Sequence, residues 1–450
     1  MPTLLVRNAD VLVTMDEDRR EISGGGLFVR NGVIEAVGTA TELPTQADEI
    51  LDMKGHVVTP GLINTHHHFY QNLTRCVPMA QNATLFDWLR TLYPIWSRIV
   101  PGDIRVSALV ALAELALSGC TCSADHLYIF PNGARLDDEI EAAQEIGVRL
   151  HATRGAMSIG ESAGGLPPDS LVEQEDNILA DCLRVIQAHH DPNPGAMIRI
   201  AVAPCSPFSV SRELMRDTAL LARDQGVMLH THLAENEDDI AYCLDHFGCR
   251  PGRYAEDLGW TGDDVWFAHC VKLDSHEIDL FARTRTGVAH CPCSNMRLGS
   301  GIAPIRAMRD LGVKVGLGVD GSASNDSGHL LNEARQAMLL QRVAHGGDAM
   351  CAREALEIAT VGGAQVLGRD DLGVLAPGKR ADFAAFDTTA IDMAGVWDKV
   401  AGLVLCGPMR AKHTVVEGRK VVYEGKLLTI DLPGVLKNHA DSAARLMAGA

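Results

Sequence analysis

The segment Val57-Val58-Thr59-Pro60-Gly61-Leu62-Ile63-Asn64-Thr65-His66-His67-His68 holds the first indication of the fold. Its apolar, β-branched part predicts a buried strand, and the histidines follow where that strand ends. Side chains two positions apart on a strand share a face, so His66 and His68 point together while His67 points away. Two adjacent imidazoles supply half of a metal site. A polar loop with unrelated histidines is the alternative, because a His-x-His pair alone is a weak signal.

The chain has 450 residues, 46% of them hydrophobic, and a formal net charge of −18. This length suits one large catalytic domain and a smaller one. The acidic surface argues against nucleic acid or anionic membranes as partners. We find no membrane-spanning apolar run and no N-terminal signal segment. The twelve cysteines are typical of reduced, mostly buried thiols. These features favour a cytoplasmic protein. We also expect a homo-oligomer whose partners are a small molecule and water.

Residues 61–370 alternate apolar strands with helical patterns, which predicts βα units and a parallel sheet. With the strand before His66 the strand count reaches eight, and we predict an α/β fold with a (β/α)8 TIM barrel. Residues 1–60 and 371–450 have the pattern of short strands with tight turns, and each is too small to bury a core alone. We expect both ends to form one small β domain, with residues 403–405 among its strands and a terminal helix from Gly434 on.

Ionisable side chains stand at the predicted C-terminal ends of several strands, where barrel enzymes carry their chemistry. Packing alone does not explain polar residues at successive strand ends. The side chains at these strand ends are His66, His68, His232, Glu235, His269 and Asp320. Three histidines and one aspartate from this set would suit a catalytic divalent ion that keeps room for water.

Each of these positions also has a structural interpretation. Asp320 could cap the helix that follows it. Glu235 could be a first-turn carboxylate that the helix dipole favours. His230 lies one layer deeper than the strand end, and we interpret it as a hydrogen-bonded core histidine rather than a ligand. His126 and His290 also fall near strand ends, and we interpret them as core histidines or as histidines that support the ligands, with a role as ligands as the less favoured alternative.

These motifs resemble those of the amidohydrolase superfamily. The matching segments are residues 60–68 with Gln71, 232–235, 268–270, 294–296, 318–321 and 376–382. The resemblance implies a distorted barrel with a β-sandwich built from both ends of the chain. No lysine ends the third or fourth strand, where two-metal members carry a bridging lysine. The resemblance is therefore to the mononuclear deaminase branch, which implies one zinc or iron ion per chain, held by His66, His68, His232 and Asp320.

Within that branch the chain resembles the 8-oxoguanine deaminases, through residues 71–75, 85–96, 154–168 and 203–207. This implies hydrolytic deamination of 8-oxoguanine to uric acid and ammonia, with isocytosine as a second substrate. Nucleoside deaminases of the branch usually carry a histidine where Cys205 stands, which favours a free base here. The alternatives are an s-triazine (hydroxyatrazine-type) aminohydrolase and a guanine deaminase. A catalytically silent scaffold on the same fold is the non-enzyme alternative.

The resemblance also implies roles for the acid–base groups. A bound divalent ion acidifies water, and Asp320 and His269 would orient the water molecule. Glu235 would protonate the ring nitrogen beside the attacked carbon and then help ammonia to leave.

Four further residues are expected around the substrate: Gln71, Trp96, Arg154 and Cys205. Trp96 offers a stacking face, and Gln71 and Arg154 offer hydrogen-bond donors for ring carbonyls. A core position for Trp96 and a surface loop position for Arg154 are the alternatives.

Overall fold

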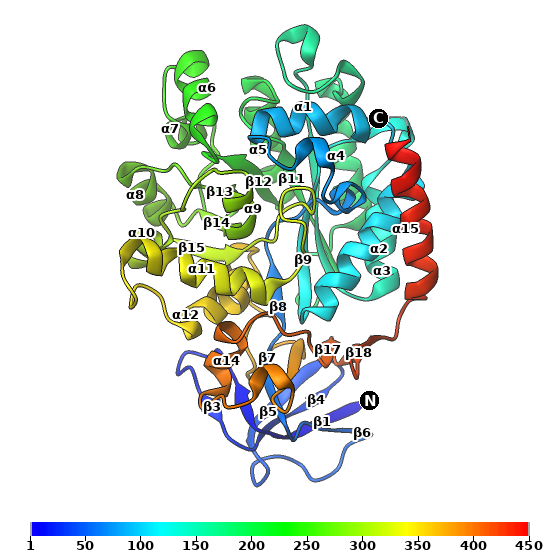
Figure 1. Ribbon diagram of the computed structural model, residues 1–450, viewed down its shortest axis with the longest axis vertical. Coiled ribbons are helices and arrows are strands. Elements are labelled where there is room, and N and C mark those ends of the chain that lie inside the picture. The colour runs from blue at the N-terminus through cyan, green and yellow to red at the C-terminus, as the bar shows by residue number, and fades with distance from the viewer. Residues whose placement is uncertain (1, 449–450) are drawn as a thin grey trace.

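A closed barrel of eight parallel strands makes up the larger part of the computed structural model, which describes residues 2–448 (Figure 1). The ring closes where β15 pairs with β8 through Leu317 and Asn64. The strands are β8 (Leu62–Asn64), β9 (Cys120–Leu127), β10 (Arg149–Ala156), β11 (Ile198–Pro204), β12 (Met228–Leu233), β13 (Val265–His269), β14 (Gly287–His290) and β15 (Lys314–Leu317). The predicted α/β fold with a (β/α)8 barrel is confirmed.

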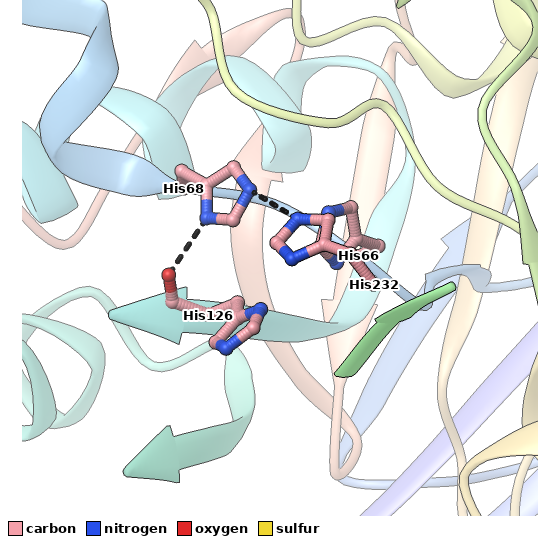
Figure 2. A group of neighbouring side chains, drawn as sticks. All are labelled: His66, His68, His126 and His232. Carbon is pink, nitrogen blue, oxygen red and sulfur yellow. Dashed lines mark hydrogen bonds between the residues drawn. The ribbon is translucent and has the colours of Figure 1, made fainter. Parts of the chain in front are cut away.

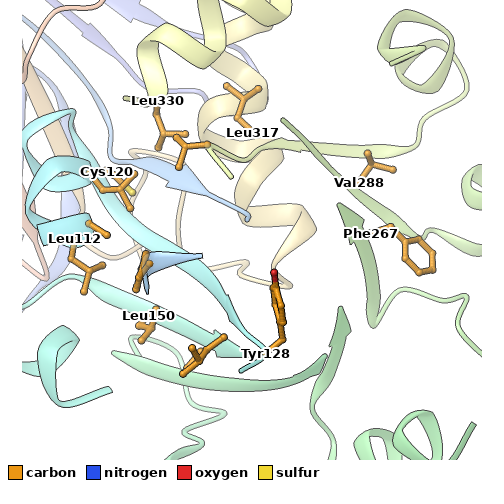
Figure 3. Packing of buried hydrophobic residues seen from close by; sticks show 14 of the residues in the cluster. Leu112, Cys120, Tyr128, Leu150, Phe267, Val288, Leu317 and Leu330 are labelled. Carbon is orange, nitrogen blue, oxygen red and sulfur yellow. The ribbon is translucent and has the colours of Figure 1, made fainter. Parts of the chain in front are cut away.

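Helices surround the barrel, so strands such as β9 and β10 are buried at every position. Figure 3 shows this core, in which Phe267, Val288 and Leu317 share one cluster with Leu112 and Leu330 from the surrounding helices. None of the helices within residues 2–448 has the length and apolar character needed to cross a bilayer. The helices are α1 (Leu85–Trp96), α2 (Pro101–Leu117), α3 (Leu136–Ile146), α4 (Glu175–His189), α5 (Arg212–Gln225), α6 (Glu237–Phe247), α7 (Pro251–Asp257), α8 (Ser275–Thr284), α9 (Pro292–Arg297), α10 (Ile305–Asp310), α11 (Leu330–His345), α12 (Ala352–Glu357) and α13 (Gly363–Val366).

Two further sheets form a β-sandwich beside the barrel, at the lower end of the view in Figure 1. One sheet has the order β5 (Val33–Thr39), β4 (Gly25–Arg30), β1 (Thr3–Ala9) and β6 (Glu49–Asp52). The other has the order β19 (Lys426–Leu427), β18 (Arg419–Tyr423), β17 (His413–Val416), β16 (Phe383–Asp387), β7 (His56–Pro60), β2 (Val11–Val13) and β3 (Glu21–Ile22). Antiparallel pairing of β7 with β16 joins the two ends of the chain. Apolar side chains of both sheets, among them Val6, Leu27, Val58 and Phe383, form one core between them.

The apolar run before the histidines forms two strands rather than the single strand that we predicted. β7 ends at Pro60 and belongs to the sandwich, whereas β8 begins at Leu62 and belongs to the barrel. Gly61 lies at the crossing, and a Cβ atom there would stand 2.0 Å from the Thr121 hydroxyl. Only glycine fits this close approach, so the chain passes directly from one sheet to the other.

Residues 403–405 do not form the strand that their apolar pattern suggested. They end helix α14 (Lys399–Leu405), which packs against α11 and α12. The Asp398 side chain caps this helix by accepting hydrogen bonds from the backbone N–H groups of Val400 and Ala401 at 3.1 and 3.0 Å. The cap and the packing of one apolar face outweigh the strand propensity of the short segment. The chain then ends in α15 (Leu432–Met447), which packs against α2 on the flank of the barrel (Figure 1).

A buried ion pair connects the barrel to the sandwich. Arg149 begins β10 and is fully buried. Its guanidinium donates from Nε and Nη2 to the two carboxylate oxygens of Asp382, at 2.8 and 2.9 Å, and it also pairs with Glu417. Asp382 immediately precedes β16, so the pair fixes the sandwich beneath the barrel.

We expect Arg149→Met to lower the free energy of unfolding by about 3–5 kcal/mol, because it leaves the buried Asp382 carboxylate without its partner. Arg90→Met is the matched control: Arg90 pairs with Asp87 on the surface, where loss of an ion pair costs about 0–1 kcal/mol. Urea unfolding of both variants measures the difference. Equal losses would contradict a structural role for the buried pair.

Candidate active site

Ionisable side chains gather at the end of the barrel where the strands finish. His66 and His68 follow β8, His232 lies in β12, His269 ends β13 and Asp320 follows β15. All are buried except His232, which is partly buried. The structure thus brings together side chains that lie far apart in the sequence.

The backbone is strained at these strand ends. Ala234, His269, Cys270 and Asp320 have φ angles of 51°, 70°, 51° and 61°, in the left-handed region that residues with a Cβ atom avoid. Each such residue costs about 1–3 kcal/mol and persists only where its surroundings impose it. These left-handed conformations turn the chain sharply at the ends of β12, β13 and β15, and the turns direct the adjacent side chains into the site.

Four side chains converge most closely, and we call His66, His68, His232 and Asp320 the convergent cluster. The Asp320 Oδ1 atom lies 3.2 Å from His66 Nε2 and 3.3 Å from His68 Nε2. The Nε2 atoms of His68 and His232 are 3.2 Å apart (Figure 2). The Nε2 atoms of the three rings and a carboxylate oxygen therefore share one small region.

Backbone carbonyls determine which ring nitrogen carries the proton. His68 Nδ1 donates to the His126 carbonyl at 2.7 Å (Figure 2), and His232 Nδ1 donates to the Cys205 carbonyl at 2.6 Å. Because a carbonyl oxygen only accepts, Nδ1 carries the proton in both neutral rings. Their Nε2 atoms are therefore unprotonated, and each carries a free lone pair.

His66 reaches the same state through a second histidine. His230 Nδ1 donates to the Trp266 carbonyl at 2.9 Å, so His230 Nε2 is an acceptor. It receives the Nδ1 proton of His66 at 2.8 Å. His66 Nε2 therefore carries a free lone pair as well. This atom is buried and has no hydrogen-bond partner within residues 2–448. As predicted, His230 lies one layer deeper and holds a neighbour by a hydrogen bond.

The convergent cluster fits a divalent cation. Burial lowers the pKa of His66 and His68 and lowers that of His232 to about 3, so the rings stay neutral. Three lone pairs beside a carboxylate repel one another unless a positive charge lies between them. Imidazole nitrogens held by carbonyls on their far side are the usual donors to such ions.

His126 lies beside the three histidines of the cluster, a position that fits either a histidine that supports the ligands or the less favoured ligand role. One ring nitrogen of each of His66, His68, His126 and His232 lies within 4.8 Å of the others. His126 Nε2 donates to the Ala203 carbonyl at 2.8 Å, which leaves Nδ1 as a buried lone pair. The motif matches did not indicate this nearness, because His126 lies inside β9 and outside the matched segments.

Glu235 and His269 lie next to each other beside the cluster. His269 Nε2 lies 3.6 Å from Glu235 Oε2 and 4.0 Å from Asp320 Oδ2. Burial raises the pKa of Glu235 to about 7. Burial alone would lower the pKa of His269, but the Glu235 and Asp320 carboxylates outweigh it and raise that pKa. A carboxyl group whose pKa lies near neutrality, as that of Glu235 does, is suited to move protons.

Two serines hold Asp320, and the sequence analysis assigned neither of them this role. Ser294 and Ser324 donate to Asp320 Oδ2 at 2.5 and 3.0 Å. The Gly321 backbone N–H donates to Oδ1 at 2.7 Å. Ser294 lies in a matched motif, which was the available signal for it.

A pocket opens onto these groups. Gln71 and Cys205 line it, as do Glu235, His269 and Asp320. His68, His232 and Ser324 line it too. The remaining lining side chains are aromatic or apolar, and sequence reasoning did not single them out individually. They are Leu85, Trp88, Leu89, Tyr93, Tyr128, Phe208 and Leu298. The first four belong to α1, which lies within the matched segment 85–96.

The structure does not bring Trp96 to the pocket. Trp96 is fully buried, and its indole N–H donates to the Thr74 hydroxyl at 3.1 Å. Trp88, two turns earlier on α1, lines the pocket instead. Both tryptophans fit the apolar pattern of the helix, so the pattern could not distinguish them.

Arg154 also lies outside the pocket lining. Its guanidinium is buried against the Phe130 ring, 3.8 Å from the ring centroid. It forms ion pairs with Glu173 and Asp181, each at 2.8 Å. With these partners Arg154 stabilises the long connection after β10 and does not line the pocket.

A sequence profile of the amidohydrolase family matches residues 57–421. The chain belongs to the amidohydrolase family. It is 45% identical over 430 residues to the 8-oxoguanine deaminase of Pseudomonas aeruginosa, an alignment that covers 95% of this chain and 96% of that protein. It is 37% identical to the hydroxydechloroatrazine ethylaminohydrolase of Pseudomonas sp. (strain ADP), over 96% of this chain and 93% of that protein.

A solved structure of the atrazine chlorohydrolase of Arthrobacter aurescens, complexed with zinc, superposes on this amidohydrolase with a TM-score of 0.93. The two chains are 36% identical, and the match covers 98% of this chain and 100% of the other. The resemblance to the amidohydrolase superfamily is confirmed, and with it the expectation of an enzyme that hydrolyses C–N bonds.

The hydrogen bond from His66 to His230 provides a test of the cluster as a metal site. We expect His230→Leu to weaken metal binding about 10- to 100-fold, because the proton on His66 Nδ1 loses its acceptor. His151→Leu is the matched control, since both histidines contact the Trp266 ring but only His230 bonds to His66. Elemental analysis after dialysis against graded chelator compares the variants, and wild type should hold close to one ion per chain. Equal metal retention in the two variants would show that the hydrogen bond from His66 to His230 does not support metal binding.

Proposed function

We propose that this amidohydrolase is a one-metal deaminase that converts 8-oxoguanine to uric acid and ammonia, with isocytosine as a second substrate. The observation that carries the proposal is the placement of an acid–base pair and a metal-fitting cluster on one small, largely aromatic pocket. The 45% identity to an 8-oxoguanine deaminase supports the choice of substrate. A triazine aminohydrolase is the second candidate, because a hydroxydechloroatrazine ethylaminohydrolase is 37% identical over nearly the whole chain.

We propose His66, His68, His232 and Asp320 as the ligands of one zinc ion, with iron as the alternative. Three imidazoles and a carboxylate suit zinc, and the atrazine chlorohydrolase relative was solved with zinc. When bound, the ion supplies Lewis acidity, which lowers the pKa of water and polarises the substrate. A cytoplasmic location and a homo-oligomeric assembly remain predictions.

The residues of the chain move the protons of the reaction. Water adds to the carbon that bears the amino group, while His269 and Asp320 hold the water molecule and Asp320 accepts one of its protons. Glu235, whose pKa of about 7 keeps a proton available, protonates the neighbouring ring nitrogen. The protons then pass to the amino group, the C–N bond breaks, ammonia leaves and a ring carbonyl remains.

The pocket walls suit a flat ring with polar edges. Trp88, Tyr93 and Tyr128 supply aromatic surface. The Gln71 carboxamide oxygen is buried with no partner within residues 2–448, so a ring N–H would satisfy it. Burial raises the pKa of the Cys205 thiol to about 12, so it stays protonated and tolerates a carbonyl beside it.

We expect Glu235→Gln to keep its metal and its fold but to lose about 10²-fold or more in kcat, as removal of a general acid–base group does. Glu237→Gln is the control, since Glu237 lies two residues away with 78% of its side chain exposed. Ammonia release and metal content are measured for both variants. If the activity of Glu235→Gln stays within a few-fold of wild type, Glu235 has no acid–base role and is only a carboxylate that precedes a helix.

We expect kcat/KM for 8-oxoguanine to exceed that for guanine by at least roughly tenfold. Guanine lacks the 8-carbonyl, so a buried donor such as the Gln71 amide or the Cys205 thiol stays unpaired, which costs about 1–3 kcal/mol. Ammonia release from 8-oxoguanine, guanine, isocytosine and aminotriazines is compared side by side. Equal activity on guanine would refute the argument from the 8-carbonyl, and activity confined to aminotriazines would favour the second candidate.

A further inference from the structure

We propose that Asp239 is a positioning residue whose carboxylate fixes the backbone of Glu235 and so directs the general acid at the substrate. This inference rests on the proposed function, because Glu235 is the acid–base group of that reaction. Asp239 lies in the first turn of α6, at the end of the barrel that carries the active site (Figure 1). It does not line the pocket, so any effect on the reaction passes through Glu235.

The turn between β12 and α6 needs support at Glu235. Ala234 adopts a left-handed conformation with φ of 51°, which a residue with a Cβ atom disfavours. The neighbouring strand end holds the turn up to this point: the Leu233 carbonyl accepts from Cys270 N–H at 3.1 Å, and the Ala234 carbonyl accepts from Lys272 N–H at 2.9 Å. These bonds leave the N–H of Glu235 to be satisfied from elsewhere.

Asp239 satisfies that N–H. Its Oδ2 atom accepts from the backbone N–H of Glu235 at 2.8 Å. The backbone N–H of Asp239 in turn donates to the Asn236 side chain at 3.0 Å, so the carboxylate is itself held in place. The two bonds form a reciprocal arrangement like a capping box, but the carboxylate reaches one residue further back, to Glu235 rather than to the N-cap Asn236.

A role in helix stability alone does not account for the burial of Asp239. Glu237 and Asp238 already supply exposed negative charge to the first turn of α6. Asp239 is only 5% exposed, and its Oδ1 atom is buried with no partner within residues 2–448. Burying a second carboxyl group beside the 4%-exposed Glu235 is unfavourable for stability, and fixing the position of Glu235 explains its presence.

The Glu235 side chain depends on this backbone position. Its carboxylate reaches His269 Nε2 at 3.6 Å on one oxygen and the Ser300 hydroxyl at 3.4 Å on the other, and both contacts are long. Contacts of this length restrain the side chain weakly. The position of the acid is therefore set mainly by its own backbone.

The test uses the metal-loaded enzyme with 8-oxoguanine as substrate. We expect Asp239→Ala to lose about tenfold or more in kcat, since a misplacement of about 1 Å can cost 10²-fold. KM and metal content should stay close to wild type. Asp239→Asn keeps an oxygen that accepts the N–H of Glu235, so it should recover most of the lost kcat. Asp238→Ala, which removes the exposed neighbouring carboxylate, is the matched control and should behave as wild type.

A double-mutant cycle separates positioning from general stability. If Asp239 acts through Glu235, Asp239→Ala should cost little when Glu235→Gln is already present. Equal losses in both backgrounds, or no recovery in Asp239→Asn, would overturn the inference. Should Asp239→Ala not fold, Asp239→Leu, which resembles the carboxylate in shape, replaces it in the cycle. If Glu235→Gln itself remains active the proposed function fails, whereas a normal Asp239→Ala beside an impaired Glu235→Gln refutes only the role of Asp239.

Discussion

The ring nitrogens of His66, His68 and His232 and the Asp320 carboxylate direct their electron pairs at one another across 3.2–3.3 Å in a buried site. Such an arrangement is unfavourable by itself, because buried lone pairs and a buried charge both need a partner. A divalent cation would supply that partner, and the surroundings fit one. Every outer ring nitrogen is occupied by a carbonyl or by His230, which forces the inner nitrogens to be acceptors.

The fold makes this arrangement possible by bringing strand ends together. Residues separated by up to 254 positions, from His66 to Asp320, meet because β8 and β15 are neighbours in the closed barrel. Left-handed residues after three of the strands then turn the chain into the site. The rigidity of the barrel sustains this strain, and the buried Arg149–Asp382 pair connects that barrel to the sandwich formed by the chain ends.

Two carboxylates in one pocket have different environments and so can perform different tasks. Asp320 accepts hydrogen bonds from two serine hydroxyls and a backbone N–H, which stabilises its charged form. Glu235 is buried with fewer donors, and its pKa rises to about 7. Carboxyl groups whose pKa values are separated in this way can begin the same reaction in different states, Asp320 as a charged proton acceptor and Glu235 as a proton donor.

The sequence by itself determined the barrel, the joining of the two chain ends and the residues that converge at the strand ends. These features follow from local periodicity and from motifs whose spacing is short, so they can be detected without coordinates. Only the tertiary structure decided that the run before His66 divides at Gly61 between two sheets, and that residues 403–405 end a capped helix. It also decided that Trp88 rather than Trp96 faces the pocket, that Arg154 is held by Glu173 and Asp181, and that His126 joins the histidine group. The physical reason is the same in each case. Packing between segments distant in sequence decides which element a short apolar segment joins and which of several chemically similar residues contacts a site. The local sequence pattern carries no information about that packing.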